Sequence, residues 1–290
     1  MLNSRDIRTK INIIKNTQKI VRAMELAAVN KMRNSRIDME KTQPYALRIL
    51  DVINHVMKAH SEYSHPYLRT PLLKKNIGMI IVSTDRGLCG TLNIDLFKMA
   101  LGLIKIYNKK KLNVNLHLVG TKSIEFFKNL RDIKIASSLT FQDFSLPATP
   151  KIISTLFDSF STYKVDNVLL CINKFVSAIN QQPTVIQLLP ILSEKSIQNE
   201  KSFAQHWDYL YEPDSKSVFD QLLVNYLDAQ VQKALSEHLV CEQAARMIAM
   251  KNAINNADET ITELKLQYNK ARQAVITQEL ADILSGADAI

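Results

Sequence analysis

Glycine and proline are scarce in this sequence of 290 residues, which holds only 6 Gly and 8 Pro. Turns draw heavily on both residues, so their scarcity disfavours a loop-rich or all-β chain and makes helix the first expectation. No apolar run approaches the ~20 residues that a helix needs to cross a bilayer, and the N-terminus has no signal-peptide core. We therefore expect any membrane association to run through partner proteins.

Cysteine and histidine are also too sparse to form an obvious site. Cys89, Cys171 and Cys241 lie far apart without C-x-x-C spacing, which disfavours a disulfide framework or a zinc site and fits a reducing compartment. No two histidines lie four residues apart, and neither a Ser–His–Asp arrangement nor paired carboxylates stand out. The sequence thus predicts no catalytic residue, no metal site and no bound cofactor.

The charge of the chain is +9 and is unevenly distributed. Residues 1–60 carry 12 Lys and Arg against 5 Asp and Glu, a net +7, whereas residues 216–290 carry 7 against 10, a net −3. A basic segment fits nucleic acid, but it fits an acidic protein sleeve equally well. Opposite charges also suit two segments that lie against each other.

The N-terminal segment has the pattern of one long helix. Neither Gly nor Pro occurs before Pro44, and apolar residues recur at spacings of three, four or seven. A helix from about Ser4 to about Tyr45 would be roughly 60 Å long. Gln18 and Glu25 interrupt its apolar stripe with polar groups. The stripe consists of Ile7, Ile11, Ile14, Val21, Ala28 and Met32.

The C-terminal segment predicts a second, longer helix, because no Gly or Pro occurs between Pro213 and Gly286. Its apolar residues form a heptad seam, which predicts a left-handed supercoil with a partner helix. The partner is either the N-terminal helix or a second copy of the chain, and the opposite charges favour the N-terminal helix. The seam comprises Val240, Met247, Ile254, Ile261, Tyr268 and Val275, with Met250, Ala257, Leu264 and Ala271 between them.

The middle of the chain alternates short apolar runs with helical patterns. Strands are expected at 77–83, 114–119 and 165–172, with a further strand at 184–189, and helices at 91–107 and 123–130. Strand and helix in alternation predict a Rossmann-like α/β domain with parallel strands. The fold class is therefore α/β with a long antiparallel coiled coil, divided into residues 1–60, 75–195 and 210–290.

Two short motifs in the middle resemble ligand sites only superficially. The turn at 85–90 (DRGLCG) follows a strand and precedes a helix, as phosphate-binding loops do, but it matches neither common glycine-rich consensus. A tight turn is the better interpretation. Lys109, Lys110 and Lys111 lack the interleaved aromatic residues of a single-strand binder and are expected in a solvated loop.

Six longer motifs follow one another along nearly the whole chain. They are 7–11 (IRTKI), 15–20 (KNTQKI), 23–25 (AME), 83–90 (STDRGLCG), 242–247 (EQAARM) and 268–280 (YNKARQAVITQEL). In sequence and in order they resemble the gamma subunits of bacterial rotary ATP synthases, although the paired regulatory cysteines of the plastid form have no counterpart. The resemblance implies an antiparallel coiled coil of both termini inside the alpha/beta hexamer, with the α/β domain at the end near the membrane ring.

The resemblance also implies a function and a set of partners. The chain would be the non-catalytic central-stalk rotor, present in one copy, that couples proton flow to ATP synthesis or hydrolysis. Its partners would be the alpha and beta subunits, the epsilon subunit and the c-ring, with no nucleic acid. It would lie peripherally at the cytoplasmic face of the inner membrane, attached only through the ring.

By the same resemblance, particular residues would make these contacts. The contacts with the hexamer would come from Met24, Arg272, Gln273, Thr277 and Glu279, and those with the membrane ring from Tyr209, Tyr211 and Glu212.

Two other functions remain open from the residues themselves. The basic N-terminal segment would suit a coiled-coil adaptor that binds nucleic acid, and the turn at 85–90 would suit an enzyme with a degenerate nucleotide site. Co-purification with a large ATPase, nuclease-resistant retention on heparin, and nucleotide binding by the isolated chain would separate the three functions.

Overall fold

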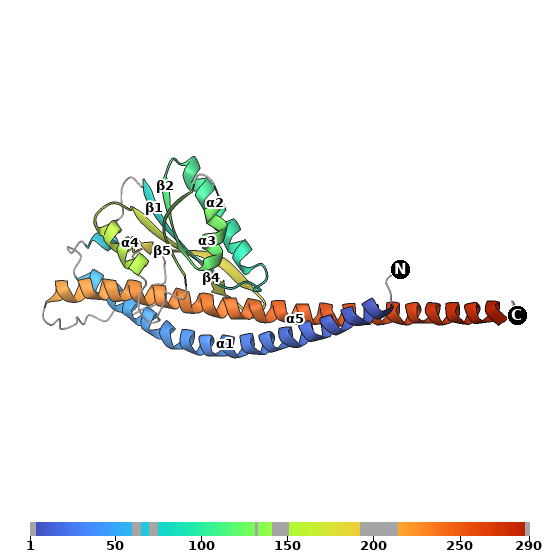
Figure 1. Ribbon diagram of the computed structural model, residues 1–290. Coiled ribbons are helices and arrows are strands. Elements are labelled where there is room, and N and C mark those ends of the chain that lie inside the picture. The colour runs from blue at the N-terminus through green and yellow to red at the C-terminus, as the bar shows by residue number, and fades with distance from the viewer. Residues whose placement is uncertain are drawn as a thin grey trace. The chain divides into compact units, whose positions relative to one another are not determined.

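The computed structural model describes residues 4–59, 65–69, 75–130, 133–140, 151–191 and 214–287. The chain divides into two compact units, one made of Met1–Asn30 with Arg246–Ile290 and the other of Lys31–Ala245. The two long helices α1 (Ser4–Ala59) and α5 (Ser215–Ala287) each contribute to both units (Figure 1). We call the first the coiled-coil unit and the second the sheet unit.

The coiled-coil unit is held by one apolar seam between α1 and α5. Ile7 and Ile11 of α1 form a buried cluster with Ile261 of α5, and Leu264, Tyr268 and Ala271 pack against it. Further along α1, the Gln18 side chain donates to the backbone carbonyl of Ile254, at 3.5 Å. The partner's number falls as that of α1 rises, so the two helices run antiparallel within one chain.

The buried positions of the seam follow the heptad. Along α1 the side chains that are buried or half-buried alternate at spacings of four and three, as a left-handed pair requires. Residues 254–271 of α5 repeat the same spacing, which confirms the predicted seam there. On α1 these side chains are Ile7, Ile11, Ile14, Gln18, Val21, Glu25 and Ala28.

The sheet unit is built on five strands in the order β3-β2-β1-β4-β5. β1 is parallel to β2 and β4, β2 is parallel to β3, and β5 runs antiparallel to β4. The strands are β1 (Asn76–Val82), β2 (Asn113–Val119), β3 (Lys134–Leu139), β4 (Asn167–Phe175) and β5 (Gln181–Leu189).

Helices cover both faces of this sheet, as its near-continuous apolar strands require. On one face α2 (Leu92–Lys109) and α3 (Thr121–Lys128) bury Leu96, Phe97 and Phe127 against β1, β2 and β4 (Figure 1). The other face is covered by α4 (Lys151–Ser161) and by the parts of α1 and α5 that belong to this unit. A short 3₁₀ helix, η1 (Pro66–Leu68), adds Tyr67 to that core.

The four predicted strands are present with shifted ends, but four elements differ from the sequence-based expectation. β3, α4 and the short helix η1 were not predicted. α1 continues to Ala59 through Pro44, although proline normally ends or kinks a helix. Its continuation buries Ile49 and Ile53 in the core of the sheet unit, which offsets the cost of the proline.

Candidate functional site

The turn after β1 lies where open α/β sheets usually bind ligands. β1 stands between β2 and β4, so the connections from this part of the sheet leave in opposite directions. The crevice beyond the carboxyl ends of β1 and β4 is the switch point at which such folds take nucleotides. The motif at 83–90 follows β1 directly into this crevice.

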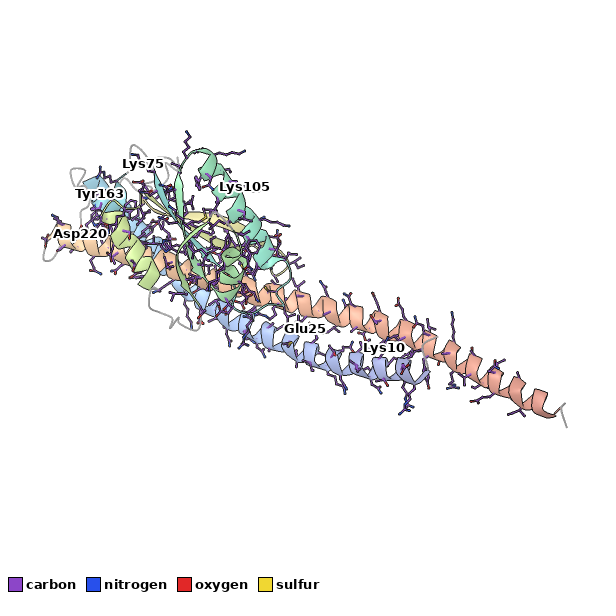
Figure 2. All side chains as sticks on the ribbon, turned by 45° about the horizontal axis from the view of Figure 1, so that its top comes forward. Lys10, Glu25, Lys75, Lys105, Tyr163 and Asp220 are labelled. Atoms are coloured by element: carbon purple, nitrogen blue, oxygen red, sulfur yellow. The ribbon has the colours of Figure 1, made fainter. Side chains whose placement is uncertain are left out.

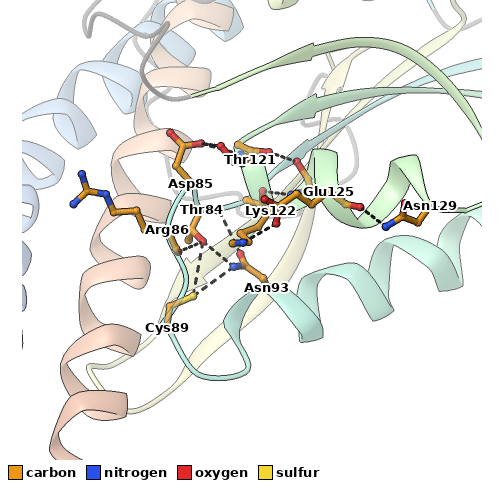
Figure 3. A network of polar contacts seen from close by, with 12 residues as sticks. Thr84, Asp85, Arg86, Cys89, Asn93, Thr121, Lys122, Glu125 and Asn129 are labelled. Atoms are coloured by element: carbon orange, nitrogen blue, oxygen red, sulfur yellow. Dashed lines mark hydrogen bonds and ion pairs between the residues drawn. The ribbon is translucent and has the colours of Figure 1, made fainter. Parts of the chain in front are cut away.

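Side chains of the chain itself satisfy the polar groups of this turn. Asn93, near the start of α2, donates through Nδ2 to Thr84 Oγ1 at 2.7 Å and to Cys89 Sγ at 3.4 Å. Thr84 Oγ1 in turn donates to the carbonyl of Arg86 at 2.8 Å. Figure 3 shows these groups converging while the Arg86 side chain points away from them. Leu88 and Gly90 take left-handed φ values of 63° and 60°, which complete the tight turn.

The start of α3 is occupied by a carboxylate. Asp85 Oδ1 accepts from the backbone N–H of Thr121 at 2.8 Å and from its hydroxyl at 3.0 Å (Figure 3). Helix N-termini attract anions, and here the anion is a side chain of the same chain. Gly120 is needed beside it, because its φ is 96° and an added Cβ would lie 2.2 Å from the carbonyl oxygen of Ser83.

Apolar residues fill the space next to the turn. Cys89 and Leu92 form a buried cluster with Cys241 and Ala245 of α5, and Phe175 at the end of β4 packs against it. Cys241 Sγ donates to the carbonyl of Asn173 at 3.3 Å, and Glu237 accepts from the N–H of Phe175 at 3.0 Å. Burial raises the pKa of the Cys241 thiol, which keeps it protonated and unreactive. This arrangement makes the motif a packed structural turn.

Two histidines of the sheet unit, His117 and His238, are structural groups. Burial lowers the pKa of His117 to about 4, and its Nδ1 lies 2.6 Å from Ser137 Oγ on the neighbouring strand. Burial also lowers the pKa of His238 on α5 to about 4. Within the described ranges no group of three or more His, Cys, Asp or Glu is placed to hold a metal ion. No helix in those ranges has the length and apolarity to span a membrane.

The residues expected to contact the hexamer lie on the surface of the coiled-coil unit. The Met24 side chain on α1 is 42% exposed, which is high for an apolar residue. Arg272, Gln273, Thr277 and Glu279 are all exposed on α5. Within this set the one hydrogen bond that is resolved is local to the helix, from Thr277 Oγ1 to the carbonyl of Gln273 at 2.9 Å. The predicted ring contacts Tyr209, Tyr211 and Glu212 lie outside the described residues.

One feature of this surface escaped the sequence-based analysis. The end of α5 exposes a run of large apolar residues, and Val275, predicted to lie in the seam, is 46% exposed. Among the described residues, the seam cluster that includes Ile7 reaches to Ala271 on α5. The signal was present in the sequence as apolar residues off the heptad. The exposed residues are Val275, Ile276, Leu280 and Ile283.

Comparison with known proteins places these features in one family. Residues 3–290 match the family described as ATP synthase. The chain is 46% identical to the ATP synthase gamma chain of Pasteurella multocida over 298 residues and 44% identical to that of Coxiella burnetii over 294, each match covering both chains completely.

Solved structures agree on the fold. One chain of the Euglena gracilis mitochondrial ATP synthase, in a structure of its OSCP, F1 and c-ring, aligns with a TM-score of 0.65 at 18% identity, over 99% of this chain and 94% of the other. A rotor chain of the same enzyme gives a TM-score of 0.62 at 19% identity, over 94% and 98% of the two chains. With full-length identity to curated relatives and the same fold, the chain belongs to the ATP synthase gamma chain family.

Proposed function

We propose that this chain is the central rotor of a proton-translocating ATP synthase, turning inside the alpha/beta hexamer without catalysing a reaction itself. The observation that carries the proposal is full-length identity to gamma chains together with an α5 end whose apolar and charged side chains are exposed. A nucleic-acid adaptor has no support from these relatives. Proton flow through a membrane ring would supply the rotation.

The coiled-coil unit has the physical properties that a shaft needs. Its antiparallel pair buries one seam and leaves the remaining faces of both helices to a surrounding sleeve. Supercoiled helices bend less easily than single ones because knobs-into-holes packing fixes their register. A shaft with unequal faces presents a different surface to each catalytic site as it turns, which is how rotation would change their states.

The end of α5 would contact the hexamer. Arg272 and Gln273 are exposed on α5 directly after Ala271, the last residue of the seam cluster, so packing of the coiled coil does not use their side chains. A guanidinium makes two parallel hydrogen bonds to a carboxylate of an acidic beta-subunit loop, and Gln adds one neutral bond. Partly desolvated, such charge-assisted bonds contribute about 1.5–3 kcal/mol each, against under ~1 kcal/mol for a solvated helix charge.

The other predicted contacts complete the assignment. Met24 supplies an adaptable apolar side chain beside Glu25, and Thr277 and Glu279 extend the polar surface of α5. The contacts with the membrane ring would come from Tyr209, Tyr211 and Glu212, since Tyr combines apolar area with a hydrogen-bonding hydroxyl group. The subunit would then lie at the cytoplasmic face of the inner membrane, together with an epsilon subunit.

The experiment that tests this proposal is Arg272→Ala in the assembled complex. We expect rotor–hexamer affinity to fall by roughly tenfold or more, or ATP turnover to slow, while helicity and melting of the isolated subunit stay unchanged. Lys265→Ala is the matched control, because it removes one exposed cation from the same helix one heptad, or about two helical turns, earlier.

The two variants together make the outcome clear. If Arg272→Ala assembles and turns over like the parent chain, or if both variants lose function equally, the contact assignment is wrong. If the isolated Arg272→Ala subunit is clearly destabilised, Arg272 stabilises the subunit's own fold and the proposed role fails.

A further inference from the structure

The sheet unit carries a concentration of positive charge at the amino-terminal edge of its sheet, opposite the turn at 83–90. Each of the four mutually parallel strands begins at a lysine or within three residues after one, and an arginine follows η1 in the same unit. All seven of these side chains are exposed. The group, which we call the basic edge, consists of Arg69, Lys75, Lys109, Lys110, Lys111, Lys134 and Lys164.

The backbone contacts show that these residues gather on one edge. The carbonyl of Lys75 accepts from the N–H of Asn113 at 2.8 Å, and the carbonyl of Lys164 accepts from Asn76 Nδ2 at 3.1 Å. Figure 2 shows Lys75 and Tyr163 at the same end of the sheet unit. Strands lie about 4.8 Å apart, so the starts of four strands span roughly 14 Å. Charges at neighbouring strand starts reinforce one another, because the strand spacing is shorter than the Debye length of about 8 Å at physiological salt.

The carboxylate of the edge is already engaged. Asp166 Oδ2 accepts from the backbone N–H groups of Lys75 and Asn76, both at 2.8 Å. Elsewhere in the unit lysines have acidic partners, as in the Lys98–Asp95 pair. Among the residues that the structure describes, none of the seven cations of the basic edge lies within ion-pair distance of a carboxylate. The hydrogen bonds from neutral N–H groups leave the negative charge of Asp166 in place, so the seven cations exceed it by six positive charges. This remaining positive field is available to an external anion.

The composition of the basic edge distinguishes between kinds of polyanion. Six of the seven cations are lysines, and lysine is depleted in protein–protein interfaces, where arginine and aromatic residues are enriched. Lysines near an anionic lipid surface, in contrast, each contribute about a fivefold change in partitioning. Tyr163, 63% exposed with its ring beneath the Arg69 guanidinium at 4.6 Å, is a residue type enriched at membrane–water interfaces.

From these observations we propose that the basic edge is a docking surface for anionic phospholipid headgroups. The contact is additional to any attachment through a membrane ring and does not depend on the contacts proposed for α5. Long lysine side chains reach a planar array of phosphates without a preformed pocket, and the ordered strand starts hold their charges side by side.

The test measures binding of the purified full-length chain to phosphatidylcholine vesicles with and without phosphatidylglycerol. We expect binding only to the anionic vesicles, with a steep loss on added salt. Lys110→Gln together with Lys111→Gln should weaken binding by about thirtyfold. Lys122→Gln together with Lys174→Gln removes one half-buried and one exposed lysine from the opposite edge and should change binding by less than about threefold. Thermal melting of both double variants verifies folding.

Four results would overturn the proposal. Equal binding to neutral vesicles would mean apolar insertion, and equal weakening by both double variants would mean attraction to net charge alone. Stronger competition by inorganic phosphate than by chloride at matched ionic strength would mean a site for the free ion. Tighter, edge-dependent binding of a DNA duplex would mean that the natural ligand is nucleic acid.

Discussion

The two compact units bury their apolar residues in opposite ways. The sheet unit encloses a central sheet between helices, and strand residues such as Met79, Ile80 and Leu170 are completely buried. The coiled-coil unit has a single seam, and residues between its seam positions, such as Ile20 and Leu266, are about 60% exposed. A two-helix pair has one buried face per helix, whereas a covered sheet has two.

This difference indicates that the sheet unit contributes most of the buried core, whereas the coiled-coil unit provides most of the surface for contacts with other molecules. The sheet unit carries the two large buried apolar clusters of the described residues. The coiled-coil unit keeps most of its surface for other molecules, including the exposed apolar residues at the end of α5, since exposed apolar patches often mark interaction sites. Substitutions in the two units should therefore produce separable effects.

The largest effect is expected in the core of the sheet. Leu170→Ala removes a fully buried side chain from β4 and should lower the free energy of unfolding by about 2–5 kcal/mol, because the cavity cannot collapse between a sheet and its helices. Leu266→Ala on an exposed face of α5 should change it by less than about 0.5 kcal/mol. Urea unfolding of the isolated chain measures both, and similar values would remove the contrast between the units.

Acid should weaken the sheet unit through His238. Its pKa is lowered to about 4 by burial, against 6.5 for an unperturbed histidine, so the folded state resists a proton that the unfolded state accepts. The stability contributed by the neutral side chain is complete above pH 6.5 and is lost as the pH falls to about 4, by on the order of 3 kcal/mol. His238→Leu should flatten the pH dependence in that window. An unchanged slope would assign acid sensitivity to other groups.

The seam should respond locally. Ile261→Ala opens the cluster with Ile7 and Ile11, at a cost of about 2 kcal/mol, the low end for a core truncation because the seam is one residue deep. Hydrogen exchange should accelerate in residues 4–30 and 246–287 while the amides of β1 and β4 keep their protection. Faster exchange throughout the sheet would show that the two units unfold together.

The smallest effect is expected at Gln18, a polar residue in the seam. Its side chain makes a long hydrogen bond to the Ile254 carbonyl, so Gln18→Leu should gain apolar contact and raise seam protection by under about 1 kcal/mol. The same change should loosen the choice of register, since a buried polar group specifies alignment. Cysteine pairs placed across the seam would report extra registers as additional cross-linked products.

The helices and strands that could be predicted are those whose sequence pattern lies within the element itself. The seam of α5 was predictable because the heptad from Met247 to Ala271 repeats without interruption. β3 was not, since its sequence KIASSL is weakly apolar and becomes a strand by pairing with β2, where His117 meets Ser137. The signal for α4 was available, as Leu156, Phe157 and Phe160 lie on one helical face.

For the candidate contact residues, too, some features could be predicted from the sequence and others required the structure. Motifs identified the exposed pair Arg272 and Gln273 without coordinates, yet the exposure of Val275 requires knowing that the seam cluster reaches only Ala271. The turn at 83–90 was correctly expected to be tight. That Cys241 and Ala245 pack beside it could not be predicted, because they lie about 150 residues further along the chain.

The sequence by itself determined the periodicities: two long helices of opposite charge with matching seams, and alternating strands and helices between them. Those follow from the 3.5-residue and 2-residue repeats, which are local properties of the chain. The tertiary structure decided what is brought together from a distance, including the filled crevice at the end of β1 and the lysines of the basic edge. The order of the strands in the sheet decides which distant residues become neighbours. That order depends on burying both faces of the whole sheet at once, and no short segment of the sequence encodes this requirement.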